Sequence, residues 1–598
     1  MSASRLQIKA PIRAVLVANR GEIAVRIIRA CRELGIRAIA VHSAADAGAF
    51  WTRMADDARD IGPAAAAQSY LNIEAIVAAA GAAGADAVHP GYGLLSESPI
   101  FAQAVRDAGL RFIGPSPSAI AIMADKVTAR KAATDAGLPV LPGTESTVES
   151  IAEGLKAAPA IGWPIAVKAS FGGGGRGMRV AQSESDLEAA MEQASREAAA
   201  AFGRAEIYLE RYLPKPRHIE VQILADSRGG VIHLGDRDCS VQRRHQKLLE
   251  EAPAPALPDG LRQRIADASV RLARSVGYES AGTVEFLADI ANDAFYFLEM
   301  NTRLQVEHGI TELVTGVDIV REQIAIAAGE LLSLHQQDVV VRGHAIQARI
   351  AAEDAWDGFR PSPGRIEALR LPQGPGVRLD FGVEAHDEIP GHYDSMFGKI
   401  QALAATRDEA RLRLGVALDD FMVAGVPTTA SYLRILLDQP SFAAVTHDTG
   451  SLEREWRPDP AKRPTPTLAA VTAAPSAPAY SERRIAAPWG GRLIEVAVFG
   501  RVDNGAAAAA SGNARPNREL AGAVIGGPDV TAPMDASVNA IPVKLGDTVA
   551  KGAPLVILEA MKMEVIVSAQ RDGLVSVIHV APGDAVKIGA TLLTLSEA

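Results

Sequence analysis

The sequence predicts a multidomain protein, α/β and α+β over roughly its first 455 residues and all-β near its C-terminus. Its 598 residues are too many for one domain, since domains usually have about 150 residues. From Arg13 the chain reads as strand, helix and strand, and the residues after about 529 contain an internal repeat of short apolar segments. The apolar fraction of 48% is enough for several hydrophobic cores.

Composition excludes several classes of function. The net charge is −10 and the basic residues are spread through the chain, which leaves no basic surface for a nucleic acid. No apolar run approaches the roughly 20 residues that cross a bilayer, and no targeting segment precedes the first strand. Cys31 and Cys239 are too few for a disulfide framework. We therefore expect a cytoplasmic protein that binds neither nucleic acid nor membrane.

The first 124 residues are expected to form an α/β sheet. The segment AVLVANRGEIAVRIIRACRELGIRAIAVHS places Ile23, Ile27, Ile28 and Cys31 on one face of a helix. Only Gly21 lies in the preceding turn, so the three-glycine fingerprint of a nicotinamide dinucleotide site is missing. The later segment HPGYGLLSESP is either a ligand loop at the carboxyl edge of the sheet or simply a turn.

A glycine loop in the central region favours a nucleotide site. Lys168 ends the predicted strand WPIAVKAS, directly before FGGGGRGM. The glycines can bring several N–H groups onto phosphate oxygens, while Lys126 and Lys168 add positive charge. The alternative is a flexible surface hairpin. The loop glycines are Gly172, Gly173, Gly174, Gly175 and Gly177.

Two further segments are unusually polar for predicted strands. IYLERYLPKPRHIEVQILAD reads as strand, turn and strand, and should bring Glu210, Leu213 and His218 close together. FLEMNTRLQVEHGITE is expected to form a single strand whose alternate residues make one polar row. Any one of these residues alone would most often be structural, but central strands seldom contain so many without ligands. The row consists of Glu299, Asn301, Arg303, Gln305 and Glu307, with Glu285 nearby.

The C-terminal repeat predicts a small flattened barrel with Lys562 at its midpoint. The residues Gly546, Asp547, Val549, Gly552, Ala553, Leu555 and Leu558 recur at a constant offset as Gly583, Asp584, Val586, Gly589, Ala590, Leu592 and Leu595. Glycine and aspartate at turns with aliphatic residues between them indicate two similar sets of strands. Lys562 lies at the junction, in EAMKME. It is either an ordinary surface lysine or the attachment point of biotin or lipoate, and with a methionine on each side the segment resembles the biotin attachment signature.

Taken together, these segments resemble the biotin carboxylase branch of the ATP-grasp enzymes, fused to a biotin carboxyl carrier domain. The matching segments are LVANRGEIAVR, HPGYG, SFGGGGRGM, RDCSVQRRHQK, EMNTRLQVEH, GHAIQARI, YDSMFGK and EAMKM. The resemblance implies an N-terminal α/β domain (1–124), an ATP-grasp domain (125–335), a C-terminal α+β domain (336–455), an Ala/Pro/Gly-rich linker region with a short β segment (456–528) and an all-β biotinyl or lipoyl-like barrel (529–598).

The resemblance also implies a reaction, in which biotin on Lys562 is carboxylated by ATP and bicarbonate through carboxyphosphate. ATP would be held by Lys126, Lys168, the glycine loop, Glu210, Leu213, His218, Gln242 and His245. Mg²⁺, or Mn²⁺ in its place, would be bound by Glu285, Glu299 and Asn301. Bicarbonate would be held by Lys247, Arg303, Gln305 and the Val306 backbone, with Glu307 as general base. Arg349 would stabilise the enolate-like oxygen of biotin.

Among proteins of this kind, the chain resembles the short α-subunits of bacterial, especially actinobacterial, acyl-CoA carboxylases. The resemblance therefore implies a separate carboxyltransferase β-subunit, a biotin protein ligase, and a homo-oligomer within a larger α/β complex. Acetyl-CoA or propionyl-CoA would be the acceptor, the first being a step of fatty acid biosynthesis. Two alternatives are a biotin-bearing scaffold without catalysis and an ATP-grasp ligase that joins a carboxylate to an amine.

The chain departs from the family pattern at three positions. Gly309 replaces a proline after Glu307 and His308, which predicts a loop that is freer in φ. Gln347 and Ala351 replace a glutamate and an asparagine beside Arg349. These two changes predict altered support for Arg349, with an effect on turnover rather than on the type of reaction.

Overall fold

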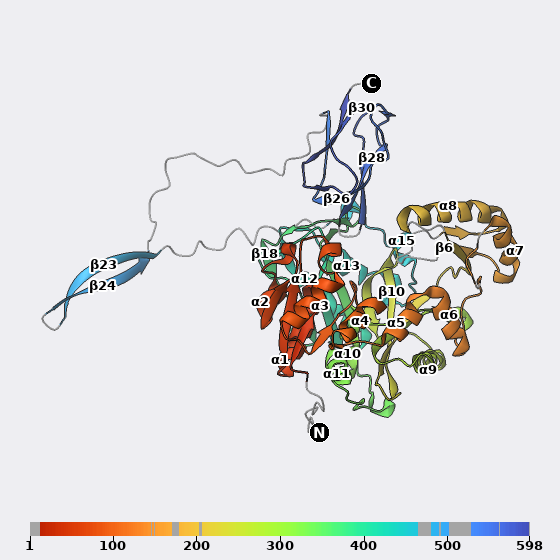
Figure 1. Ribbon diagram of the computed structural model, residues 1–598, viewed down its shortest axis with the longest axis horizontal. Helices are drawn as coiled ribbons and strands as arrows, with labels where there is room; N and C mark the ends of the chain where they lie inside the picture. Colours follow the sequence, from red (N-terminus) through yellow and green to blue (C-terminus); the bar gives the residue numbers. More distant parts are fainter. Residues whose placement is uncertain are drawn as a thin grey trace. The chain divides into compact units, whose positions relative to one another are not determined.

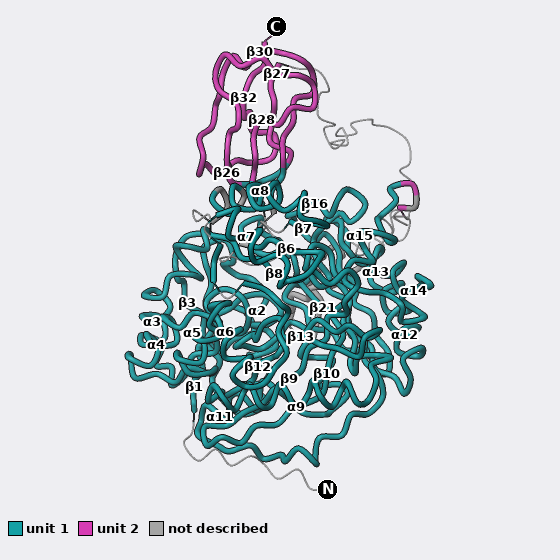
Figure 2. Tube along the Cα trace, turned by 90° about the vertical axis from the view of Figure 1, so that its right-hand side faces the viewer, with its two compact units in different colours: residues 1–460, 534–536, 559–565 teal, residues 461–533, 537–558, 566–598 magenta. Residues whose placement is uncertain are grey.

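The computed structural model forms two compact units, one built on residues 1–460 and one built largely on the residues after 460 (Figures 1 and 2). It describes residues 12–144, 146–148, 150–169, 179–202, 206–463, 480–489, 492–501, 528–560 and 563–596. None of the helices in these ranges is long and apolar enough to span a bilayer.

A five-stranded parallel sheet opens the first unit, in the order β3-β2-β1-β4-β5. Helix α1 (Gly21–Glu33) connects the first two strands, and its predicted apolar face, including Ile23, Ile27 and Cys31, is fully buried. This confirms the predicted α/β start. The strands are β1 (Ala14–Val17), β2 (Arg37–His42), β3 (Asp57–Asp60), β4 (Ala87–His89) and β5 (Arg111–Phe112), with helices α3 (Ile73–Ala82) and α4 (Pro99–Asp107) between later strands.

A small antiparallel sheet, in the order β7-β6-β8, follows in the chain. Its strands are β6 (Ile165–Ala169), β7 (Arg179–Ala181) and β8 (Ile207–Arg211), accompanied by helices α6 (Lys126–Asp135), α7 (Ile151–Ile161) and α8 (Glu184–Phe202). Lys126 begins α6 directly after Asp125, whose side chain caps the helix by accepting from the Thr128 N–H. The predicted glycine loop, Gly172 to Gly177, lies outside the described residues.

An eight-stranded antiparallel sheet carries most of the site, in the order β13-β12-β9-β10-β11-β14-β21-β19. Its strands are β9 (Arg217–Ala225), β10 (Val231–Arg243), β11 (Gln246–Ala252), β12 (Ser280–Asp289), β13 (Ala294–Asn301), β14 (His344–Ala351), β19 (Val377–Phe381) and β21 (Met396–Ala404). Helices α9 (Asp259–Ser275), α10 (His308–Thr315), α11 (Ile319–Ala327) and α12 (Arg407–Asp420) pack on it. Because β11 pairs with β14, one sheet joins residues on both sides of position 335, where the predicted ATP-grasp domain ends.

The predicted single strand through Glu299 and Glu307 is wrong. Strand β13 ends at Asn301, and residues 302–307 form a turn into α10, of which Glu307 is the N-cap. The Arg303 guanidinium bonds the side chains of Asn301 (2.7 Å) and Gln305 (2.9 Å). These side chains therefore gather around a turn instead of lying in a row along one strand.

A buried ion pair in this sheet gives a pH-dependent contribution to stability. Burial alone would raise the pKa of Asp238, but Arg217, His447 and the hydrogen bonds from Ser240 together outweigh burial and lower the pKa from 3.8 to about 2. A carboxyl group whose pKa is lower in the folded protein stabilises the fold at pH values above its pKa in the unfolded chain, by about 2 kcal/mol here. This stabilisation is lost as the pH falls toward 2. We expect Asp238→Asn to lower the Tm at pH 7, with a gap to the unmodified protein that narrows below about pH 4. A gap that is constant between pH 7 and pH 3 in thermal scans would contradict this.

The second unit contains an antiparallel hairpin, β23 (Tyr480–Trp489) with β24 (Arg492–Arg501), paired from Tyr480 with Arg501 to Trp489 with Arg492. It falls within the predicted linker region, at the segment expected to hold one short strand or hairpin. Residues 464–479, 490–491 and 502–527 of that region lie outside the described residues.

Two four-stranded sheets form the predicted C-terminal barrel, in the orders β25-β32-β30-β27 and β29-β28-β26-β31. The repeat is visible in the core, because Val549 and Val586, Leu555 and Leu592, and Leu558 and Leu595 are all buried. Lys562 and Met561 lie outside the described residues, between the neighbouring strands β28 and β29. The strands are β25 (Asp529–Thr531), β26 (Ala536–Ala540), β27 (Thr548–Val549), β28 (Pro554–Ala560), β29 (Met563–Ser568), β30 (Gly573–Ile578), β31 (Ala585–Val586) and β32 (Thr591–Ser596).

Candidate active site

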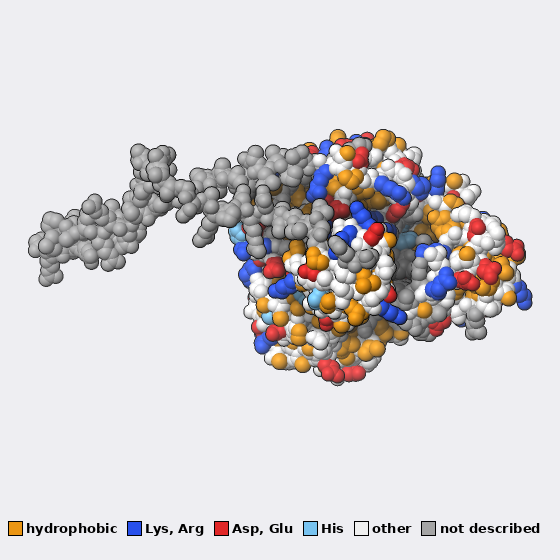
Figure 3. All heavy atoms as spheres, turned by 90° about the horizontal axis from the view of Figure 1, so that it is seen from above, with side chains coloured by type: hydrophobic (Ala, Val, Ile, Leu, Met, Phe, Trp, Pro, Cys, Tyr) orange, Lys and Arg blue, Asp and Glu red, His pale blue; other side chains and the backbone are white. Residues whose placement is uncertain are grey.

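A cavity of about 1170 Å³ in the first unit gathers nearly all the predicted site residues that the structure describes. Those that line it are Lys126, Lys168, Glu210, Leu213, His218, Gln242, His245, Lys247, Glu285, Glu299, Asn301, Arg303, Gln305, Val306 and Arg349. Glu307 is fully buried and bonds two of the lining residues, Lys247 and Arg349. Figure 3 shows that basic and acidic side chains are interspersed on the surface of the described residues that is seen from above.

Lys247 is the centre of a buried cluster of charges. Its Nζ lies 2.6 Å from a carboxylate oxygen of Glu220, 2.9 Å from Glu285 and 2.8 Å from Glu307. Burial would lower the pKa of Lys247, but the surrounding Cys239 and carboxylates raise it well above its usual value. Lys247 is therefore charged, and it balances part of an acidic cluster that would otherwise repel itself.

Glu307 is held as a carboxylate by two cations. Lys247 donates to one of its oxygens, and Arg349 donates to the other at 2.9 Å. Burial would raise the pKa of Glu307, yet Lys247, Arg349 and Arg237 together hold it well below the usual value. Glu307 is therefore ionised, and an anion that shares these cations would raise its pKa.

Arg349 is supported by a second carboxylate that the sequence analysis did not select. Its Nε donates to Glu250 Oε1 at 2.5 Å, and Gln347 Nε2 donates to Glu250 Oε2 at 3.0 Å. Gln347 therefore contributes to the support of Arg349 through Glu250. Ala351 is another position at which the chain departs from the family pattern. Its N–H donates to the Thr429 hydroxyl, which in turn donates to the Arg349 carbonyl.

The expectation of a freer loop at Gly309 is wrong. Gly309 lies in the first turn of α10 and is buried. A Cβ at this position would come within 2.1 Å of Gln401 Oε1. The Gln401 side chain thus fills the space beside Gly309, and a larger residue would require it to move.

The HPGYGLLSESP segment is more than a turn, because it supplies two contacts to the site. Glu97 accepts from the Arg303 Nε at 3.0 Å, and the Tyr92 hydroxyl donates to Glu22. Asn19 fixes the loop by donating to the carbonyls of Pro90 (2.6 Å) and Tyr92 (2.8 Å). The edge of the parallel sheet and the turn after β13 therefore form one wall of the cavity.

At the predicted nucleotide site, the Glu210 carboxylate is shared by two cations. Both Lys168 and Arg130 donate to it. The turn after β8 also brings Leu213 and His218 to the cavity, as predicted from the strand-turn-strand pattern, although β8 and β9 belong to different sheets.

Comparison with known proteins decides the family. The chain matches the biotin carboxylase N-terminal domain over residues 11–120, the ATP-binding domain of the carbamoyl-phosphate synthase L chain over 125–335, the biotin carboxylase C-terminal domain over 347–454 and the biotin-requiring enzyme domain over 523–595. The chain belongs to the biotin carboxylase family. It joins a biotin carboxylase to a biotin carrier domain, and its activity is the ATP-dependent carboxylation of biotin.

Several relatives of this biotin carboxylase are very similar. The biotin-dependent acyl-coenzyme A carboxylase alpha3 subunit of Mycobacterium leprae is 44% identical over 593 residues, which are 97% of this chain and 98% of the relative. The biotin carboxylase of a Nostoc species is 52% identical over 72% of this chain and 96% of its own. Among solved structures, the biotin carboxylase β,γ-ATP complex of Campylobacter jejuni superposes with a TM-score of 0.72, at 45% identity, over 74% of this chain and 99% of that one.

Sequence reasoning missed several buried partners in this biotin carboxylase. Glu220 bonds Lys247 and Arg237, and Arg237 also bonds Gln222, Thr283 and Thr311. Along β9, His218, Glu220 and Gln222 alternate with Ile219, Val221 and Ile223. This alternation was the available signal, since a strand with one polar and one apolar face places alternate residues on the same side.

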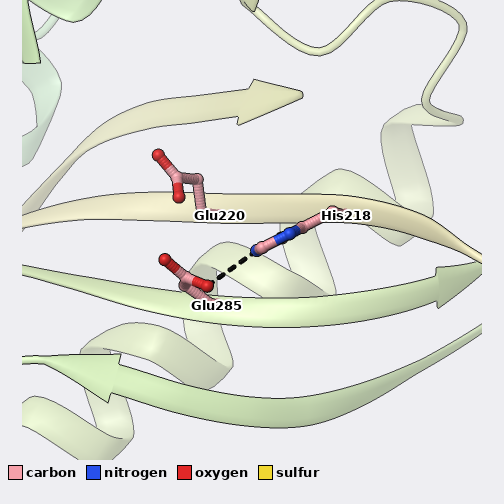
Figure 4. Close-up of side chains that lie close together, drawn as sticks. All are labelled: His218, Glu220 and Glu285. Atoms are coloured by element: carbon pink, nitrogen blue, oxygen red, sulfur yellow. Dashed lines mark hydrogen bonds and ion pairs between the residues drawn. The ribbon is translucent and has the colours of Figure 1, made fainter. Parts of the chain in front are cut away.

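The acidic end of the cavity suits a hard cation. Glu285 and Glu299 are cross-strand partners on β12 and β13, and Glu299 is open to the cavity. Glu285 also accepts from His218 at 2.7 Å and from Asn301 at 2.8 Å (Figure 4 shows His218, Glu220 and Glu285). Although Glu299 is open to the cavity, the protein around it partly removes its water, and this effect together with the neighbouring carboxylates Glu285 and Glu97 raises its pKa. Paired carboxylate oxygens fit Mg²⁺, which would relieve their repulsion.

Proposed function

We propose that the buried charge cluster performs the bicarbonate step of biotin carboxylation. Lys247, Arg303, Gln305 and the Val306 N–H hold bicarbonate, and Glu307 takes its proton as it attacks the γ-phosphate of ATP. The observation that carries this proposal is the position of Glu307, which is fully buried and bonded to both Lys247 and Arg349 at the wall of the cavity.

The charges of the cluster suit this sequence of events. Bicarbonate is an anion, so its binding draws on the positive charge of Lys247 and Arg303 and loosens their hold on the neighbouring carboxylates. The pKa of Glu307 then rises toward the range useful for a base. The resulting carboxyphosphate releases CO₂ inside the cavity. Arg349, which stays charged and has fixed donors, stabilises the negative charge that develops on the ureido oxygen of biotin.

The residues proposed for the nucleotide and its metal line the same cavity, apart from the glycine loop, which lies outside the described residues. Lys126, Lys168 and the loop Gly172, Gly173, Gly174, Gly175 and Gly177 hold the phosphates, while Glu210 and Leu213 meet the adenine and His218, Gln242 and His245 complete the site. Because the Glu210 carboxylate is bonded to Lys168 and Arg130, we assign its contact with adenine to the backbone. Glu285, Glu299 and Asn301 would hold Mg²⁺, or Mn²⁺, which neutralises phosphate charge when bound.

The second half of the reaction takes place on another protein. A biotin protein ligase attaches biotin to Lys562, and a carboxyltransferase β-subunit transfers the carboxyl group to an acyl-CoA such as acetyl-CoA or propionyl-CoA. The support is the full-length similarity to an acyl-CoA carboxylase alpha3 subunit. We place the complex in the cytoplasm, as a homo-oligomer of this chain with its β-subunits, in a role such as fatty acid biosynthesis.

The test is ADP release in the presence of free biotin, ATP and Mg²⁺, which we expect to require bicarbonate. Arg303→Met removes the proposed anion contact but no nucleotide contact. It should raise the KM for bicarbonate about 10- to 100-fold, the value of a hydrogen bond to a charged group, and leave the KM for ATP within about twofold. Equal changes in both KM values would refute the assignment of Arg303.

A further inference from the structure

The backbone of the turn before α10 offers two hydrogen-bond donors beside the cavity. Val306 is half-buried and lines the cavity, and Glu307 is the N-cap of α10. Within the described part of the chain, neither the Val306 N–H nor the Glu307 N–H donates to an acceptor. Free N–H groups at the start of a helix favour a bound anion. Their usefulness depends on how firmly the two peptide groups are oriented.

His308 holds the first of these peptide groups. Its ring Nδ1 lies 2.7 Å from the Gln305 carbonyl oxygen, and its own N–H lies 3.3 Å from the same oxygen. Because a carbonyl can only accept, Nδ1 carries the proton. The side chain is fully buried, and burial together with Lys399 and Arg26 keeps the pKa of His308 well below its usual value. The ring is thus a neutral, fixed donor.

Lys399 holds the second peptide group. Its Nζ donates to the Val306 carbonyl oxygen at 2.8 Å and lies 3.1 Å from Glu22 Oε1. The lysine side chain is fully buried in β21, and Glu22 belongs to α1 of the parallel sheet. A buried ammonium is costly unless it is paired, and Glu22 supplies the pair. The charge of Lys399 is therefore available to fix the Val306 carbonyl.

The direction of the two donors follows from the geometry of the peptide group. Both peptide bonds are trans, and in a trans peptide the C=O and the N–H point in opposite directions. The Gln305 carbonyl is turned toward buried His308, so the Val306 N–H is turned away from it. The Val306 carbonyl is turned toward buried Lys399, so the Glu307 N–H is turned away from Lys399.

We propose that His308 and Lys399 are positioning residues for bicarbonate, which act by fixing the orientation of the Val306 and Glu307 N–H groups. The inference rests on the proposed function, in which the Val306 N–H is a bicarbonate contact. It adds two residues that touch neither substrate and that come from α10 and β21. Their effect should appear in the affinity for bicarbonate and not in the affinity for ATP.

The test compares two substitutions of His308 in the full-length protein. In His308→Asn the amide nitrogen can take the place of Nδ1 and keep the bond to the Gln305 carbonyl, whereas His308→Leu removes the donor. We expect His308→Leu to raise the KM for bicarbonate about 10- to 100-fold, and His308→Asn to raise it no more than about threefold. The KM for ATP should stay within about twofold in both. A purely structural role would instead lower the Tm and change both KM values together.

Lys399 is tested with its charge partner, because Lys399→Met alone would leave Glu22 unpaired and could unfold the protein. The double variant Lys399→Met with Glu22→Gln should show the same selective rise in the KM for bicarbonate relative to the protein without substitutions, with the KM for ATP within about twofold. If His308→Leu does not fold, the double variant still tests whether the orientation of these peptide groups affects the affinity for bicarbonate.

Arg303→Met distinguishes the positioning role of His308 and Lys399 from the anion site itself. If it raises the KM for bicarbonate while the folded His308 and Lys399 variants do not, the positioning inference is overturned and the proposed anion site stands. If Arg303→Met has no effect either, the anion site itself is wrong.

Discussion

Glu307→Gln should reduce the kcat of bicarbonate-dependent biotin carboxylation by about 100- to 10,000-fold, the usual contribution of a general base. The amide has the shape of the carboxylate but cannot take a proton from bicarbonate. Its oxygen can still accept from one of the two cations, Lys247 or Arg349, while its NH₂ group would face the other. ATP should bind normally, as measured by nucleotide titration alongside steady-state kinetics with free biotin.

Glu250→Gln is the matched control, since Glu250 is the other carboxylate bonded to Arg349. It changes the charge beside Arg349 without touching the proposed base, so its loss of activity should be much smaller. Because the pKa of Glu307 is held well below 4.5, protonation of Glu307 in the free enzyme should not limit kcat/KM until the pH is far below 4.5. Full activity in Glu307→Gln would remove Glu307 from the mechanism.

Lys562→Arg should abolish transfer of the carboxyl group to acyl-CoA altogether. Arginine keeps the positive charge but cannot be joined to biotin by an amide bond. The protein without substitutions, produced in cells that contain a biotin ligase, should show one biotin in intact-mass analysis. The variant should show none. The carboxylation of free biotin should remain, because the cavity belongs to the first unit.

Lys551→Arg provides the control for this substitution. Lys551 is an exposed lysine at another turn of the carrier barrel, and its replacement should leave both biotinylation and transfer intact. A biotin that persists in Lys562→Arg would place the attachment point at a different lysine. If the protein that retains Lys562 carries no biotin when it is produced in cells with a biotin ligase, the barrel does not act as a biotin carrier.

Local pattern was enough to predict much of this architecture. The repeat around Lys562 predicted a barrel, and the equivalent residues Leu555 and Leu592 are buried alike. The alternation of strand and helix after Arg13 predicted the parallel sheet. Both signals arise from burial of one face of an element, which a single sequence records directly.

Pairing between distant charges could not be predicted in this way. Arg303 bonds Glu97, 206 residues away, and Lys399 lies against Glu22 from the start of the chain. A buried charge needs a partner, but nothing in a single sequence says which one. The turn at residues 302–307 was missed because its alternating polar residues fit the two-residue period of a strand equally well.

The strand pairing of β11 with β14 has a consequence for how such enzymes can be assembled in evolution. A chain cut near residue 335 would lose β14, with Arg349 on it, and would leave β11 as a bare edge open to aggregation. The carboxylase portion on both sides of residue 335 must therefore stay together when genes recombine. The barrel closes its own core from two related halves, so gene fusion and fission can add or remove it without opening the sheet that holds the chemistry.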